Sequence, residues 1–126
     1  MKPRWTMDGV SEFLGFQYED RGRIRLTVRP ELLNRGGLLS GVVAFGMIDY
    51  AMGSALWAET TEDERIATMN IAINYVKTAL EGDIVCVASV DRRTRSGAQL
   101  RAEVRTDDDV LVATAVGSYA IFPAKR

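Results

Sequence analysis

The most apolar stretch of the chain lies between residues 38 and 58, where hydrophobic side chains occupy nearly every position and Asp49 is the only charged residue. A strand is usually much shorter than this. A transmembrane helix would have the required length of about 20 residues, but it would bury an aspartate in the bilayer at a cost of roughly 2.5–3.5 kcal/mol. A helix that is apolar all round because the fold covers it all round explains the pattern best.

The segments on both sides of this helix alternate between apolar and polar residues, as half-buried strands do. Upstream, Asp8 is expected to cap a short helix that ends at Gly15, and residues 16–20 and 23–29 predict a hairpin. Residues 31–39 and 59–65 are expected to be loops. Further strands are predicted at residues 69–75, 84–90, 99–105 and 110–122, separated by short turns. The almost continuously apolar run 84–90 is expected to be central and covered on both faces.

This order of elements predicts an α+β fold in which an antiparallel meander curves around one long central helix. The exposed edges of such a sheet can be covered by dimerisation. The length of 126 residues fits one domain, residues 1–126.

Composition narrows the possible settings and partners. The net charge of −1 shows no excess of basic residues of the kind that binds nucleic acid. Cys86 is the only cysteine, so no disulfide can form within the chain, and we expect a reduced, cytoplasmic setting. The first 13 residues contain no apolar core of about 7–15 residues, which a secretory signal requires. The flanking amphipathic strands and Asp49 also argue against a membrane protein.

The chain contains no histidine. This excludes Ser–His and Cys–His nucleophilic pairs and removes the commonest metal ligand, so we expect no metal and no cofactor. Acid–base chemistry must then use a carboxylate, lysine, tyrosine, water or backbone group. A carboxylate in the middle of a buried helix is costly, and function is a common reason for keeping one.

One spaced motif resembles a known family. Asn34-x-x-Gly37-x-x-Ser40-Gly41, followed by Asp49 nine positions after Ser40, resembles the pattern N-x-x-G-x-x-H-G-G and its later acidic residue. That pattern is typical of hotdog-fold acyl-CoA thioesterases of the phenylacetate-pathway type, within the 4-hydroxybenzoyl-CoA thioesterase superfamily. The resemblance extends over residues 14–122. It departs from the family at two positions, where Ser40 replaces the histidine and Val42 replaces the second glycine.

The resemblance implies a hotdog fold and hydrolysis of an acyl-CoA to the free acid and coenzyme A. It assigns Gly41 as the backbone donor to the thioester oxygen, Asp49 as general base or nucleophile, and Asn34 as a neighbour of the reacting centre. Ser40 is expected to cap the helix or to take part in catalysis, and the N–H of Gly41 or Val42 can then face the substrate. Tyr50 is expected to help shape the acyl pocket.

Helix geometry suggests that the site is shared between subunits. Gly41 and Asp49 lie eight residues apart, which is about 12 Å of rise on one helix. One thioester carbon cannot meet both groups from the same helix. We therefore expect a homodimer or a dimer of dimers in which one subunit supplies Gly41 and its partner supplies Asp49.

A basic turn follows the run 84–90, and arginine binds phosphate by bidentate pairing. The residues expected to bind the phosphates of coenzyme A are Arg92, Arg93, Arg95 and Ser96.

Structural alternatives remain open at each position. In these alternatives Asp49 is a buried carboxylate that makes dimerisation specific, and Gly41 allows the helix and a strand to pack closely. Asn34 is a turn residue, and the arginine turn is a solvated loop.

Two alternative functions also remain open. The first is a non-catalytic hotdog protein that binds acyl-CoA or a related ligand, which the loss of histidine at Ser40 favours. The second is a dehydratase or hydratase, which in this fold relies on a histidine that the chain lacks.

Overall fold

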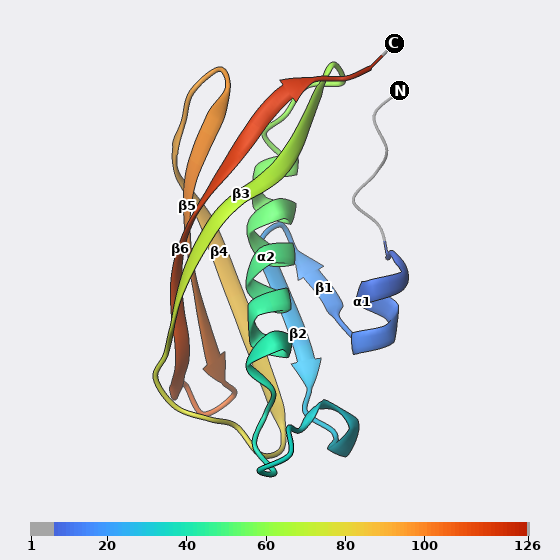
Figure 1. Ribbon diagram of the computed structural model, residues 1–126, viewed down its shortest axis with the longest axis vertical. Helices are drawn as coiled ribbons and strands as arrows, with labels where there is room; N and C mark the ends of the chain where they lie inside the picture. Colours follow the sequence, from blue (N-terminus) through green and yellow to red (C-terminus); the bar gives the residue numbers. More distant parts are fainter. Residues whose placement is uncertain (1–6, 126) are drawn as a thin grey trace.

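The computed structural model describes residues 7–125 and confirms the predicted architecture, a curved antiparallel sheet against one long helix (Figure 1). The part of the signal-peptide prediction that concerns residues 1–6 lies outside the described residues. The elements in chain order are α1 (Gly9–Leu14), β1 (Gln17–Asp20), β2 (Arg23–Thr27), the 3-10 turn η1 (Pro30–Leu32), α2 (Gly41–Trp57), β3 (Glu64–Tyr75), β4 (Asp83–Arg93), β5 (Gly97–Thr106) and β6 (Leu111–Pro123).

The short helix α1 and the first hairpin form as their sequences predict. The carboxylate of Asp8 accepts a hydrogen bond from the N–H of Ser11 at 2.8 Å and caps α1, and Gly15 ends it with a φ of 88°. Gly22 takes a φ of 67° in the turn between β1 and β2, where its backbone lies close to β4. A Cβ at this position would stand 2.5 Å from the carbonyl oxygen of Ala88, so only glycine fits.

The central helix α2 packs along the concave face of the sheet (Figure 1). Met47, Ile48 and Met52 are fully buried in this contact. The expectation that the fold covers α2 on all sides is wrong for its N-terminal half, because Val42 is 77% exposed and Phe45 is 37% exposed. Within residues 7–125 no helix combines the length and hydropathy needed to cross a bilayer.

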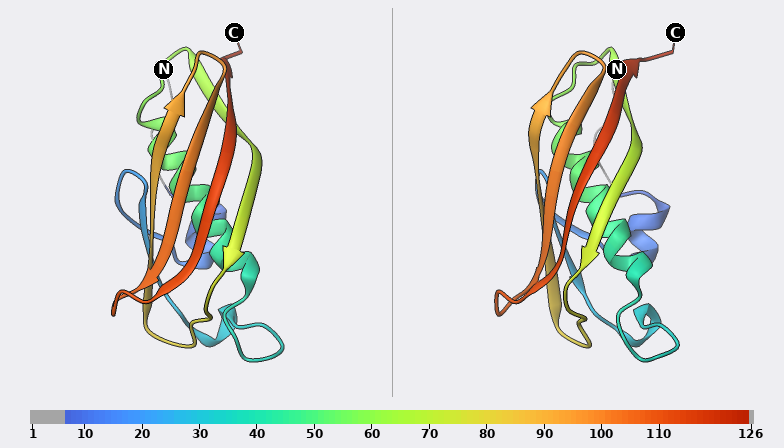
Figure 2. Two further views of the ribbon diagram at one scale, coloured as in Figure 1. Left: turned by 90° about the vertical axis from the view of Figure 1, so that its left-hand side faces the viewer. Right: turned by 60° about the vertical axis from the view of Figure 1, so that its left-hand side comes forward.

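The strands form one six-stranded sheet in the order β1-β2-β4-β5-β6-β3. Figure 2 shows β4, β5, β6 and β3 side by side in front of α2. The predicted simple meander is therefore incorrect at one point: β3 pairs with β6 at the far edge, and residues 76–82 return the chain to β4 in the middle of the sheet. In the described part of the chain β3 has a neighbour on one side only, so it presents a long free edge.

The strand β3 is longer than predicted and changes phase along its length. It begins at Glu64 instead of at residue 69, and a bulge lies between Thr68 and Asn70. A bulge inserts one residue and moves the following side chains to the opposite face. Ile71 and Ile73 therefore pack against the core, whereas Met69, predicted to share their face, is 68% exposed.

The other predicted strands lie where expected, but β4 is covered on both faces only at its start. Ile84, Val85 and Cys86 are buried, whereas Val87 is 46% exposed on the outer face. This outer face carries charges instead of a second layer.

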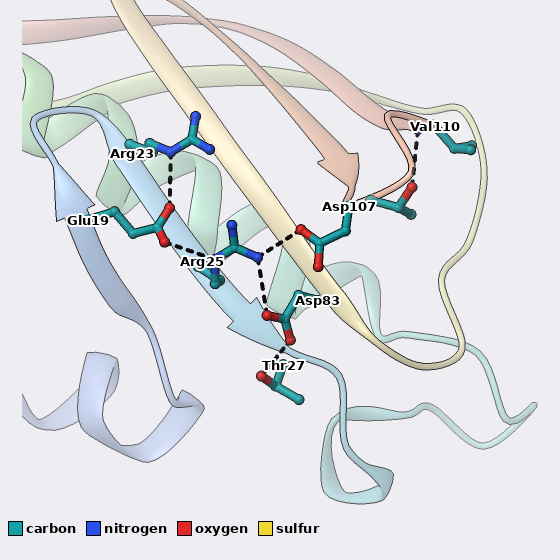
Figure 3. Close-up of polar contacts among 8 residues, drawn as sticks. Glu19, Arg23, Arg25, Thr27, Asp83, Asp107 and Val110 are labelled. Atoms are coloured by element: carbon teal, nitrogen blue, oxygen red, sulfur yellow. Dashed lines mark hydrogen bonds and ion pairs between the residues drawn. The ribbon is translucent and has the colours of Figure 1, made fainter.

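Arg25 stands at the centre of the charged cluster in Figure 3. Its guanidinium contacts Glu19 at 2.8 Å, Asp83 at 3.1 Å and Asp107 at 2.8 Å. These three carboxylates lie on β1, at the start of β4 and in the turn after β5. The cluster therefore ties the first hairpin to the centre of the sheet.

Candidate active site

The N-terminus of α2 presents one backbone donor that the described protein groups leave unpaired. Ser40 caps the helix, and its hydroxyl oxygen accepts a hydrogen bond from the N–H of Val42 at 3.3 Å. The N–H of Val43 donates to the carbonyl of Ser40 at 3.0 Å. No group within residues 7–125 accepts from the N–H of Gly41. The free donor expected at this helix end is therefore that of Gly41, and the N–H of Val42 is already satisfied.

A cavity of about 590 Å³ opens in front of this helix end. The hydroxyl of Tyr75, at the end of β3, donates to the carbonyl of Gly41 at 2.7 Å. A Cβ on Gly41 would stand 3.1 Å from that hydroxyl, so the small residue leaves room for the tyrosine. The other lining residues are mainly apolar, and Lys77 is the only charged one. The lining residues are Asn34, Leu38, Leu39, Ser40, Gly41, Val42, Ala44, Tyr75, Val76, Lys77, Thr78 and Val112.

Asn34 shapes the loop that forms one wall of this cavity. Its side-chain oxygen accepts hydrogen bonds from the N–H groups of Gly36 at 2.9 Å and Leu38 at 3.1 Å. Gly37 adopts the left-handed conformation in this loop, with a φ of 78°. The carboxamide oxygen of Asn34 therefore organises the loop, and its NH₂ group is the part that can reach a ligand.

Asp49 lies half-buried in the middle of α2 and faces β3 and β6. Its Oδ1 accepts hydrogen bonds from the hydroxyls of Thr68 at 2.7 Å and Tyr119 at 2.6 Å. The Tyr119 hydroxyl also lies 2.7 Å from the main-chain carbonyl oxygen of Asp49. Within residues 7–125 no group donates to Oδ2. Asp49 is thus anchored through one carboxylate oxygen, which leaves the other for a ligand.

Sequence reasoning did not identify Thr68 or Tyr119. Alternation placed Tyr119 on a strand, whereas Thr68 lies one residue before the predicted strand 69–75. Their meeting depends on the register in which β3 pairs with β6, where these two residues are opposite each other. Burial, and then the hydrogen bond with Asp49, raise the pKa of the Tyr119 hydroxyl well above its ordinary value of 10. The hydroxyl therefore keeps its proton and remains a donor.

A second cavity, of about 270 Å³, contains Asp49. Tyr50 and Asp8 form one wall, and the Tyr50 hydroxyl donates to the Asp8 carboxylate at 2.8 Å. Burial and then this contact raise the pKa of Tyr50 to about 12. Burial opposes ionisation of Asp8, but the hydrogen bonds from Ser11 and Tyr50 prevail and lower its pKa. The lining residues are Asp8, Asp49, Tyr50, Gly53, Trp57, Ile66, Ala67, Thr68 and Tyr119.

The two cavities have no lining residue in common. One contains the free donor of Gly41, and the other contains the carboxylate of Asp49, about 12 Å further along the helix. A single chain therefore does not bring these two predicted residues together. Within residues 7–125 no cluster of three or more histidine, cysteine, aspartate or glutamate residues is arranged to hold a metal ion.

The basic turn divides into one paired and two exposed arginines. The guanidinium of Arg93 contacts the carboxylate of Glu64 at 2.6 Å and the carbonyl oxygen of Glu59 at 2.6 Å. Arg93 therefore ties the end of β4 to the start of β3. Arg92 and Arg95 are exposed and have no protein partner within the described residues. Ser96 is also exposed, and its carbonyl oxygen accepts from the N–H of Ile121 at 2.9 Å.

Solved structures share this architecture over nearly the whole chain. A conserved protein of Pseudomonas aeruginosa is 31% identical, with 94% of this chain and 97% of that chain covered and a TM-score of 0.88. A Bacillus halodurans protein solved with CoA is 22% identical (90% and 78% covered, TM-score 0.83). A putative thioesterase from Ralstonia eutropha, described as phenylacetic acid degradation-related, is also 22% identical (91% of each chain covered, TM-score 0.79). No curated protein matches significantly.

The sequence also matches a family model directly. The match extends over residues 36–113, more than half of the chain. It includes the helix with Gly41 and Asp49, the edge strand β3 and most of the sheet. By this match, and with the hotdog architecture around it, the chain belongs to the thioesterase superfamily.

Proposed function

We propose that this protein hydrolyses acyl-CoA thioesters in a site built from two copies of the chain. Membership of the thioesterase superfamily supports thioester hydrolysis as the general reaction. The observation that carries the finer proposal is the division of groups between two cavities, with an unpaired Gly41 N–H in one and an open Asp49 oxygen in the other. Each cavity therefore holds one of the two groups that hydrolysis needs, the oxyanion donor or the carboxylate.

The free edge of β3 provides a way to join the two halves. Antiparallel pairing of two β3 strands would bring the Tyr75 end of one strand beside the Glu64 end of the other. Tyr75 lines the Gly41 cavity, whereas Thr68, nearer the other end, lines the Asp49 cavity. Such a dimer would therefore place the Gly41 donor of one copy near the Asp49 carboxylate of its partner. It would also cover exposed apolar residues, including Val42 and Met69.

The chemistry follows from these two groups. With Asp49 as general base, water attacks the carbonyl carbon and gives a proton to the carboxylate. The carbonyl oxygen takes up the displaced electron pair, and the Gly41 N–H stabilises its charge with the help of the helix dipole. Collapse breaks the C–S bond, and the leaving thiolate receives the proton from Asp49. With Asp49 as nucleophile, the carboxylate attacks the carbonyl carbon, and breakage of the C–S bond expels the CoA thiolate and leaves a mixed anhydride. Water then hydrolyses the anhydride, which releases the acid, restores the Asp49 carboxylate and supplies the proton that the thiolate takes up.

Coenzyme A is the proposed thiol because a fold relative from Bacillus halodurans was solved with CoA. Arg92 and Arg95 have the exposure and charge to bind its phosphates. Ser96 lies beside them in the same turn. Arg93 contributes indirectly in this proposal, because its guanidinium is already paired with Glu64.

A panel of acyl-CoAs assayed for thiol release tests the proposal. Asp49→Asn preserves the shape of the side chain and removes its basicity, so it should lower kcat by roughly a hundredfold or more. The variant must keep the wild-type circular dichroism and melting temperature for the loss to count. Turnover that survives in Asp49→Asn would contradict the assignment.

A non-catalytic acyl-CoA-binding protein is the competing function. The observation in its favour is that Ser40, at the position of the family's histidine, uses its hydroxyl oxygen to cap α2. Calorimetry on the same panel separates the two functions. Saturable binding without thiol release by the wild type would favour the binding protein, whereas release that depends on Asp49 favours the enzyme.

A further inference from the structure

The two carboxylate oxygens of Asp49 have different surroundings. Oδ1 is held by two hydroxyls, from Thr68 at 2.7 Å and Tyr119 at 2.6 Å. Oδ2 receives no hydrogen bond from any protein group within residues 7–125. A carboxylate held in this way cannot exchange its two oxygens by rotation without breaking both contacts. The choice of which oxygen meets a ligand is therefore made by the sheet, and not by the helix that carries Asp49.

Tyr119 is the more strongly fixed of the two donors. It is 3% exposed, and it projects from β6 toward α2. The close approach of β6 to the helix depends on Gly117, two residues earlier on the same face of the strand. A Cβ on Gly117 would stand 2.9 Å from the sulfur of Met52 and 3.2 Å from the carbonyl oxygen of Asn70. The strand thus lies close enough for the Tyr119 hydroxyl to reach both the side chain and the main-chain carbonyl of Asp49.

We propose that Tyr119 is a positioning residue, which fixes Oδ1 of Asp49 and so presents Oδ2 as the oxygen that abstracts the proton or attacks the thioester. This inference rests on the proposed function. The hydroxyl has one hydrogen and two acceptors, the carboxylate oxygen at 2.6 Å and the main-chain carbonyl oxygen at 2.7 Å. It therefore restrains the side chain relative to its own backbone. Orientation of this kind affects the chemical step more than substrate binding.

Tyr119→Phe removes the hydroxyl and keeps the ring in the core. We expect kcat to fall roughly ten- to a hundredfold, the effect of losing one hydrogen bond to a charged group, while KM stays within about twofold. Tyr18→Phe is the matched control, because it removes a hydroxyl that contacts Ser11 at 2.7 Å and is not one of the two donors to Oδ1 of Asp49. The control should keep the wild-type kcat.

A double variant separates positioning from a general structural effect. If Tyr119 acts through Asp49, then Tyr119→Phe should cause no further loss of kcat in an Asp49→Asn background. Equal fold-losses in both backgrounds would overturn the inference. So would a rise in KM without a change in kcat. Should Tyr119→Phe fail to fold, Thr68→Val removes the other donor to Oδ1, and an unchanged kcat in that variant would overturn the inference equally.

The outcomes distinguish this inference from the function on which it rests. Thiol release by the wild type that is lost in Asp49→Asn but unchanged in Tyr119→Phe refutes the positioning role and leaves the hydrolase standing. Absence of thiol release by the wild type refutes both. Loss of kcat in Tyr119→Phe with unchanged KM, unchanged melting temperature and no additivity with Asp49→Asn supports both.

Discussion

Replacing Gly41 by proline tests the backbone donor with little other change. Gly41 is the first residue of α2, a position that proline favours because its N–H lies outside the helical hydrogen bonds. Ser40 before it has φ −61° and ψ 131°, close to the polyproline II conformation, which a residue preceding proline favours over the helical one. Gly41→Pro should therefore keep the helix and delete only the N–H that no described group accepts.

The magnitude follows from the role of that donor. Loss of one oxyanion donor typically lowers kcat by roughly 10²–10³. A new Cβ at this position would stand 3.1 Å from the Tyr75 hydroxyl, so the 54% exposed tyrosine must move slightly. Gly41→Ala is the matched control because it adds the same Cβ and keeps the N–H. We expect thiol release by the alanine variant to remain within about tenfold of wild type, and that by the proline variant to fall much further.

Mixing two inactive variants then tests whether the site is shared. In a dimer formed from Gly41→Pro and Asp49→Asn chains, one site carries both defects and the other carries neither. Random assortment makes about half of the dimers mixed, so refolding the two variants together should restore about one quarter of wild-type activity. Equal losses in Gly41→Ala and Gly41→Pro would refute the donor role, and no recovery on mixing would refute the shared site.

Three further predictions concern the charged surface. Arg92→Ala should raise KM for acyl-CoA roughly tenfold with little change in kcat, and the same KM as for wild type would contradict phosphate binding. Arg93→Ala should lower the melting temperature, because it breaks the partly exposed ion pair with Glu64 that joins β4 to β3. Asp83→Asn should lower the melting temperature by a few degrees at pH 7. The Thr27 hydroxyl and then Arg25 lower the pKa of Asp83 below its ordinary 3.8, so its stabilisation is complete above that value and is lost as the pH falls through the folded-state pKa. The difference in melting temperature from wild type should therefore shrink in acid, and a difference that grows there would refute the reasoning.

Local features of this protein follow from local sequence. The apolar run around Asp49 predicts a helix because no other element can bury so many neighbouring side chains. Asp8, Ser40 and Gly15 act at the helix ends as their side chains or flexible backbone dictate. The turns between strands likewise lie where glycine and charged residues gather. These features depend on contacts within a few residues, which the sequence displays directly.

The place of β3 in the sheet, and the face on which each of its side chains lies, could not be predicted from local sequence in the same way. Alternation identified the strand, but the bulge after Thr68 turned Met69 outward, and pairing with β6 moved the strand to the far edge of the sheet. Both results depend on hydrogen bonds with a segment about 50 residues away. Pairing between such distant segments leaves no local pattern.

The candidate site shows the same difference between features set by local sequence and features set by contacts between distant segments. The sequence by itself determined the helix, a candidate cap at Ser40, a free donor at either Gly41 or Val42, and a carboxylate in the middle of the helix, because all of these depend on helix geometry. Only the tertiary structure decided that Asp49 meets Tyr119 and Thr68 through one oxygen, since their approach depends on the register of β3 and β6 and on the close packing at Gly117. Helix periodicity fixes which residues a helix presents, whereas the packing of the sheet against it fixes what they meet.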